Sequence, residues 1–141
     1  MSNSWVCIDA SLVIRLVADP SDKPVRDLWA GWNADRQPLA APTLLYYEVT
    51  NGLYRYQKLG LMSGSSVQSA LQAALALPIK LYGDLVLHER ARRMADRFSL
   101  SATYDAHYLA LAQWLGGELW TADGRLARGV QPALAWVHLV D

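Results

Sequence analysis

The sequence predicts an α/β fold: a single domain, residues 1–141, in which a short parallel sheet lies between helices. Apolar runs typical of buried strands alternate with longer segments of helical spacing, and no repeat, linker or low-complexity segment interrupts them. A chain of 141 residues with 52% apolar content is also long enough to build one core. Because strands joined by helices run parallel, helices are expected on both faces of the sheet.

Five short, mostly apolar segments are expected to be the strands. The last two of them close the chain. The five strands are "WVCID" (5–9), "PLAAP" (38–42), "PIKLYG" (78–83), "ELWTAD" (118–123) and "WVHLVD" (136–141).

Helices are expected in the segments between the first four strands. One begins at about Ala10, and the polar break "ADPSDKP" separates it from the next. Serines open the helix at 63–77 and can cap it, whereas Gly60 ends the helix before it. The remaining helices are "VRDLWAGWNA" (25–34), "TLLYYEVTNGLYRYQKLG" (43–60), "DLVLHERARRMADRFSL" (84–100) and "TYDAHYLALAQWLGG" (103–117).

Charge and cysteine content exclude several classes of protein. The formal net charge is zero, so any contact with nucleic acid must be local. The single Cys7 lies in an apolar run, and one cysteine cannot form an internal disulfide, which fits a reducing cytosol. No leader-like start and no long uncharged apolar stretch is found. We therefore expect a soluble, unprocessed cytoplasmic protein with no membrane partner.

Four carboxylates are expected at one edge of the sheet. Asp9 and Asp123 follow strands, and ligands of open α/β sheets bind beyond the carboxyl ends of the strands. Asp105 lies in the first turn of its helix, with Ser101 or Thr103 as the expected cap, on the stripe that faces the sheet. Glu48 borders the apolar face of the helix that Thr43 is expected to cap.

Each acid also has a local explanation that stays open. Asp123 precedes Gly124, a common turn pair, and Asp9 can cap the following helix. The helix dipole favours Asp105, and Glu48 can simply face solvent. Together, however, four carboxylates without cations would repel one another and raise their pKa values. A divalent cation would relieve this repulsion, and oxygen ligands without matching histidines or cysteines favour Mg²⁺ or Mn²⁺ over zinc.

The chain resembles the PIN-domain family, and within it the VapC-type toxins of toxin–antitoxin pairs. The resemblance covers nearly the whole chain and rests on four segments in order: "CIDASLVIRLV", "LLYYEVTNGL", "TYDAHYLALA" and "LWTADGRLA". It implies a three-layer α/β/α fold. It also implies that Asp9, Glu48, Asp105 and Asp123 form the metal-binding acidic site, with Asp9 and Asp105 as the direct ligands.

The resemblance implies a Mg²⁺- or Mn²⁺-dependent endoribonuclease that hydrolyses RNA by a metal-activated water, with Glu48 or Asp123 orienting that water. The resemblance and the positions after the acidic motifs also indicate residues that support the acids or contact RNA. The polar residues expected beside the acids are Ser11, Asn51 and Thr121, and the arginines expected to contact RNA phosphates are Arg15, Arg125 and Arg128. No histidine is given a catalytic role, because His88 and His138 have no partner at a suitable spacing. The arginines in "ERARR" (89–93) are expected on a solvated helix face.

The aromatic residues predict an interface. Six tryptophans and seven tyrosines exceed what a small core readily buries, and several are concentrated in the helices at 25–34 and 43–60. We expect a homodimer through these two helices, in which Trp29, Trp32, Tyr46, Tyr47 and Tyr54 cannot all face the sheet. The resemblance adds a cognate antitoxin as a second partner.

Three other functions fit the sequence less well. A response-regulator receiver needs adjacent acids after its first strand and a lysine after a late strand, but the last lysine is Lys80. A haloacid-dehalogenase-type phosphatase needs Asp-x-Asp after its first strand, and here Ser11 replaces the second aspartate. The remaining alternative is a catalytically inactive PIN-like module that binds RNA or a protein, and the four intact acids argue against it.

Overall fold

The computed structural model describes residues 4–140. Within this range lie seven helices and a five-stranded sheet. The strands are β1 (Val6–Ile8), β2 (Leu39–Pro42), β3 (Ile79–Tyr82), β4 (Glu118–Thr121) and β5 (Val137–Leu139). The helices are α1 (Ala10–Ala18), α2 (Lys23–Ala34), α3 (Leu44–Lys58), α4 (Gly64–Leu75), α5 (Val86–Arg97), α6 (Tyr104–Leu115) and α7 (Gly124–Val130).

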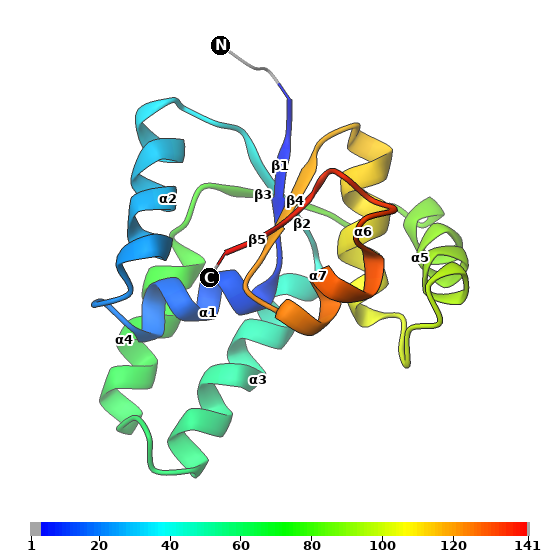
Figure 1. Ribbon diagram of the computed structural model, residues 1–141. Helices are drawn as coiled ribbons and strands as arrows, with labels where there is room; N and C mark the ends of the chain where they lie inside the picture. Colours follow the sequence, from blue (N-terminus) through cyan, green and yellow to red (C-terminus); the bar gives the residue numbers. More distant parts are fainter. Residues whose placement is uncertain (1–3, 141) are drawn as a thin grey trace.

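The sheet is parallel throughout and has the strand order β3-β2-β1-β4-β5. Helices α1, α2 and α4 lie on one side of it and α5 and α6 on the other, so the fold has the three α/β/α layers that were predicted (Figure 1). The chain passes from β1 outward to β2 and β3, and then returns to the other side of β1 for β4 and β5. This reversal leaves a switch point between β1 and β4, which is where ligands bind in open α/β sheets.

The core lies on both faces of the central strands. All residues of β1 and β2 are buried, because helices cover both faces of these strands. Helix α6 packs directly on β1, β2 and β4, and α5 covers α6 from outside. Gly52 allows α3 to approach α1 closely, since a Cβ atom there would lie 2.5 Å from the Ile14 Cδ1 atom. This approach brings the first turns of α3 toward the carboxyl end of β1.

The helix ends agree with most of the expected caps. Ser63 accepts a hydrogen bond from the Ser66 amide and begins α4, and Gly60 and Gly116 follow their helices with positive φ angles. Thr43 and Thr103 occupy the expected N-cap positions, but their side chains make no capping hydrogen bond there because both have helical backbone angles. The prediction of side-chain capping was therefore wrong for these two threonines.

Helix α7 was not predicted. It has only seven residues, two of them glycines, and such a short segment gives little periodicity. Asp123 is its N-cap and accepts hydrogen bonds from the amides of Arg125 and Leu126. The Asp-Gly pair therefore begins a helix rather than a simple turn.

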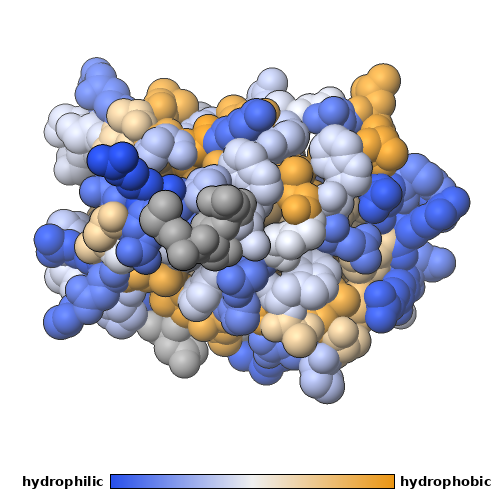
Figure 2. Space-filling view, turned by 90° about the horizontal axis from the view of Figure 1, so that it is seen from above, coloured by the Kyte–Doolittle hydropathy of each residue, from blue (hydrophilic) through white to orange (hydrophobic). Residues whose placement is uncertain are grey.

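The outer helices carry the hydrophilic surface. On α5, the Glu89 carboxylate pairs with Arg92 and Arg93, as expected for a solvated face. Figure 2 shows a hydrophilic margin on the side of the molecule where α5 lies. None of the helices within residues 4–140 is long and apolar enough to cross a membrane.

The aromatic residues of α2 and α3, through which a homodimer was predicted, differ in their exposure. The Trp32 ring packs edge-on against both Trp29 and Trp120, so the two tryptophans of α2 are partly buried inside the molecule. Tyr46 of α3 also turns inward, and its hydroxyl donates to the Ala74 carbonyl. Of the five aromatic residues, Tyr47 and Tyr54 are the exposed ones.

Candidate metal centre

Four carboxylates lie around the switch point of the sheet. Asp9 follows β1, Asp123 follows β4, Asp105 is in the first turn of α6, and Glu48 is in the second turn of α3. All four line one cavity of about 290 Å³. The expectation that these acids share one edge of the sheet agrees with this arrangement. The cavity exists because the carboxyl ends of β1 and β4 and the starts of α3 and α6 meet here.

Asp9 is the most rigidly held of the four. It is 4% exposed, caps α1, and its Oδ1 atom accepts hydrogen bonds from the Leu12 amide (3.2 Å) and the Ser11 hydroxyl (2.7 Å). The Thr121 hydroxyl donates to its Oδ2 atom. Both oxygens therefore have donors that favour the charged form and fix the direction of the carboxylate.

Ser11 and Thr121 connect the Asp9 carboxylate to the strand end that carries Asp123. The Ser11 hydroxyl accepts from the Ala122 amide at 3.0 Å, and the Thr121 hydroxyl accepts from the Asp123 amide at 2.9 Å. These two hydroxyl groups thus hold the ends of β1 and β4 in a fixed relation. Both residues had been expected beside the acids, and the structure brings them into direct contact with Asp9.

Glu48 has a partner that the sequence did not reveal. The Tyr108 hydroxyl on α6 donates to the Glu48 Oε1 atom at 2.6 Å. Tyr108 is buried among core residues, whereas its hydroxyl reaches the cavity that Glu48 lines. Because burial and the neighbouring carboxylates raise the pKa of Tyr108, its phenol stays protonated and acts as a donor.

Arg55 is a second residue of the site that sequence reasoning missed. It lies one turn of α3 beyond Asn51, and both residues line the cavity with the four acids. Its position seven residues after Glu48, on the same helical face, is the sequence pattern that could have identified it. Arg55 provides a cation at the edge of an otherwise acidic cavity.

Burial and mutual repulsion act on the acids that were expected to bind the ion directly. Burial raises the pKa of Asp9 to about 6, although hydrogen bonds from Ser11 and Thr121 oppose this shift. Burial also raises the pKa of Asp105, and the charges of Asp123 and Glu48 raise it further. A bound cation would oppose both shifts, because its positive charge favours the ionised carboxylates. The oxygen-only donor set fits Mg²⁺ or Mn²⁺ chemically.

The acids line the cavity without converging on one point. Among residues 4–140, no group of three or more acidic, histidine or cysteine side chains has a geometry that could hold a metal ion directly. Two of the acids are instead directed by protein donors, Asp9 by Ser11 and Thr121 and Glu48 by Tyr108. An ion held by three or more of these acids at once would therefore require some of their side chains to rotate.

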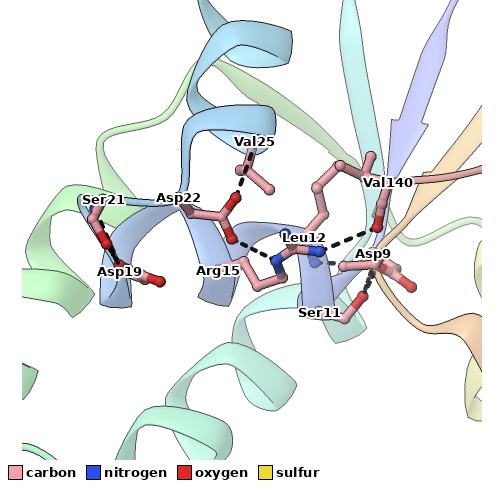
Figure 3. Close-up of polar contacts among 10 residues, drawn as sticks. Asp9, Ser11, Leu12, Arg15, Asp19, Ser21, Asp22, Val25 and Val140 are labelled. Atoms are coloured by element: carbon pink, nitrogen blue, oxygen red, sulfur yellow. Dashed lines mark hydrogen bonds and ion pairs between the residues drawn. The ribbon is translucent and has the colours of Figure 1, made fainter.

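The three arginines expected to contact RNA differ in their surroundings. Arg15 reaches from α1 to the Asp22 carboxylate at 2.7 Å and to the Val140 carbonyl at 3.1 Å, as Figure 3 shows. These contacts give Arg15 a structural role between α1, the start of α2 and the end of the chain. Arg125 and Arg128 are exposed on α7, and the Arg128 guanidinium lies over Gly124.

The histidines are paired in space, contrary to the expectation from their spacing. The His107 Nδ1 atom donates a hydrogen bond to the Thr103 carbonyl at 2.8 Å, because a carbonyl oxygen can only accept. In neutral His107 the Nε2 atom is then the acceptor, and it accepts a hydrogen bond from His88 Nδ1 at 3.0 Å. The His138 Nε2 atom on β5 contacts the Glu118 carboxylate on the neighbouring strand β4. None of the three histidines is among the residues that line the acidic cavity.

Comparison with known proteins shows which family the chain resembles. A family model described as "PIN domain" matches residues 6–130. Ribonuclease VapC3 of Mycobacterium tuberculosis is 34% identical over 125 residues, which are 87% of this chain and 85% of that protein. Ribonuclease VapC9 of the same organism is 36% identical over 122 residues, 86% of this chain and 88% of that protein.

A curated protein and a solved structure from Pyrobaculum aerophilum are also similar. Ribonuclease VapC3 of Pyrobaculum aerophilum is 32% identical over 96 residues, 64% of this chain and 70% of that protein. The crystal structure of PAE2754 from Pyrobaculum aerophilum superposes with a TM-score of 0.72 at 26% identity, and covers 97% of this chain and 85% of that one.

Proposed function

Because the chain belongs to the PIN-domain family, we propose that it is a VapC-like endoribonuclease that hydrolyses RNA phosphodiester bonds with a divalent cation. The observation that carries this proposal is the cavity at the switch point, which is lined by Asp9, Glu48, Asp105 and Asp123. Four neighbouring carboxylates repel one another, so they seldom serve only to stabilise a fold. A site that binds a divalent cation and a phosphate substrate has a role for each of them.

Asp9 and Asp105 are proposed to hold the cation, with Glu48 and Asp123 completing the acidic site. Both carboxylates line the cavity, and a cation between them would oppose the effect of burial, which raises the pKa of each. When bound, Mg²⁺ or Mn²⁺ neutralises phosphate charge and lowers the pKa of a nearby water molecule. The cavity does not distinguish the two ions.

The protein groups would prepare the reaction by position and charge. Tyr108 occupies Glu48 Oε1, which leaves Oε2 to accept a proton from a water molecule in the cavity. Asp123 is fixed by the amides of α7 and is the other candidate for orienting that water. Arg55 can bind a non-bridging oxygen of the phosphate and hold the substrate against the acids.

The test of this function is RNA cleavage by wild type and by Asp105→Asn in Mg²⁺ and Mn²⁺. The amide keeps the shape of the carboxylate but removes its charge, so we expect a folded variant without cleavage and with weakened ion binding by calorimetry. Normal cleavage by folded Asp105→Asn would contradict the metal-site assignment. The wild type should also lose its activity in EDTA and regain it when the ion is restored.

A cytoplasmic location, a cognate antitoxin and a homodimer belong to the same proposal. The exposed apolar residues that best suit a second copy are Tyr47, Leu85 and Val86, here called the α3–α5 face. Tyr47 and the residues that flank Leu85 and Val86 border one groove of about 280 Å³. Since Leu85 is 84% exposed, covering this face would remove considerable apolar surface from water.

A further inference from the structure

A second groove runs along α3 beside the acidic cavity. It is lined by residues of α3, its N-cap and the edge strand β3, and has a volume of about 750 Å³. We call it the tyrosine groove. Its lining residues are Thr43, Tyr46, Tyr47, Thr50, Asn51, Tyr54 and Leu81. Two tyrosine rings are exposed here, Tyr47 at 77% and Tyr54 at 51%.

The tyrosine groove and the acidic cavity share one residue. Asn51 lines both, and on α3 it lies four residues after Tyr47 and three before Tyr54. Residues at this spacing occupy one helical face, so the two rings flank the amide that borders the acids. A chain whose phosphate lies at the carboxylates can therefore continue over Asn51 into the groove.

Cations lie along the same end of α3. Arg55 lines the acidic cavity next to Tyr54, and the Lys58 ammonium group lies 5.8 Å from the centre of the Tyr54 ring. Exposed aromatic rings next to cations are the combination that binds single-stranded nucleic acid, because bases stack on the rings while phosphates contact the cations. A second protein copy would need an apolar surface but has no need of these charges.

From this arrangement we propose that the tyrosine groove binds unpaired RNA bases next to the cleaved phosphate, with Tyr54 as the stacking ring and Asn51 contacting a base edge. The inference rests on the proposed ribonuclease function and adds a subsite to it: a base next to the cut lies on the Tyr54 ring, on the far side of Asn51 from the carboxylates. A duplex cannot enter in this way, since its bases are stacked on one another. Tyr54 is the residue to test, because Tyr47 also belongs to the α3–α5 face.

The binding experiment uses full-length Asp105→Asn protein, so that the RNA is not cut, with a fluorescent unstructured RNA oligonucleotide and its blunt duplex. We expect the single strand to bind more tightly than the duplex. Adding Tyr54→Ala should weaken single-strand binding roughly tenfold, whereas Tyr54→Phe keeps the ring and should retain it. Leu75→Ala, an exposed apolar residue of α4 outside both grooves, is the matched control and should bind normally.

A second readout locates the RNA directly. Oligonucleotides carrying 4-thiouridine should crosslink to a peptide that contains Tyr54. Equal affinity of Tyr54→Ala and Tyr54→Phe, or crosslinks that map only outside the groove, would overturn the proposal. So would a change of oligomeric state in Tyr54→Ala with unchanged RNA affinity, because the groove would then belong to a second copy.

These outcomes are separate from a failure of the proposed function. If wild type cleaves RNA in Mg²⁺ or Mn²⁺ while Tyr54→Ala binds and cleaves like wild type, the groove assignment alone is wrong. If wild type cleaves no RNA, the ribonuclease proposal is wrong, and the RNA role of the groove is withdrawn with it. Thermal melting of each variant confirms that the exposed Tyr54 side chain was not needed for folding.

Discussion

The Tyr108 hydroxyl on α6 donates a 2.6 Å hydrogen bond to the Glu48 carboxylate on α3, sixty residues earlier in the chain. The contact joins a core side chain to an acid of the candidate site, so the orientation of Glu48 depends on how α6 packs on the sheet. Glu48 is only partly buried, and the carboxylate would be free to rotate without this donor. Tyr108 thus acts as a positioning residue.

Tyr108→Phe is expected to lower kcat roughly tenfold with little change in KM, because it removes a donor to a charged acceptor but keeps the buried ring. The loss of stability should be about 1.5–3 kcal/mol, the range for a hydrogen bond to a charged group. Steady-state kinetics and urea unfolding measure the two effects.

A double-mutant cycle with Glu48→Gln decides whether Tyr108 acts through Glu48. If it does, Tyr108→Phe has little further effect on kcat in the Glu48→Gln background. Fully additive effects of the two changes would show that Tyr108 acts through another group.

Divalent ions are expected to raise the thermal midpoint of the wild type. An ion that binds the assembled carboxylates but not the unfolded chain stabilises the fold by about 2.7 kcal/mol at a concentration one hundred times its Kd. Asp9→Asn and Asp123→Asn should each reduce the shift, whereas Asp27→Asn, an exposed acid on α2 outside the cavity, should not. An unchanged midpoint in millimolar Mg²⁺ and Mn²⁺ would argue against a cation site here.

The stability of the ion-free protein should fall as the pH rises from about 4 to about 6. Burial raises the pKa of Asp9 from 3.8 to about 6, so the folded state holds this proton more tightly than the unfolded chain does. The favourable contribution is complete below the unfolded pKa and is lost as the pH passes the folded one, an effect of about 3 kcal/mol.

Urea unfolding in EDTA across this pH range, with wild type and Asp9→Asn compared, measures the contribution of Asp9. The amide does not titrate, so the variant should lose the part of the fall that Asp9 causes and keep the part that comes from Asp105, whose pKa is also raised. Asp22 has a lowered pKa and therefore acts in the opposite direction, but its contribution is the same in both proteins. Parallel stability curves for the two proteins would show that Asp9 does not titrate in this range.

A homodimer through the α3–α5 face is expected to dissociate when charge is placed on it. Leu85→Glu and Val86→Glu change exposed side chains, so the fold should survive while an apolar contact between two copies would not. Light scattering at high micromolar protein concentration measures whether the protein is a monomer or a dimer. A monomeric wild type would exclude this dimer and leave the nuclease proposal intact. Trp32 is unsuitable for such a test because it packs on Trp120.

The sequence by itself determined the order of strands and helices and the place of the acids. Period and capping are local properties, so five strands and six of the seven helices could be predicted from neighbouring residues. The position of Asp9 and Asp123 at one edge followed from a simple rule, since parallel strands end on the same side. Helix α7 was not predicted, because seven residues with two glycines show little helical periodicity.

Only the tertiary structure decided which side chains meet across the chain. Thr121 reaches Asp9 over 112 residues and Tyr108 reaches Glu48 over 60, and no local pattern encodes such distances. The packing of α2 on the sheet turned Trp32 inward, and the contact of Arg15 with Asp22 gave that arginine a structural role. Helix packing selects these partners because each side chain adopts the rotamer that the neighbouring elements leave open.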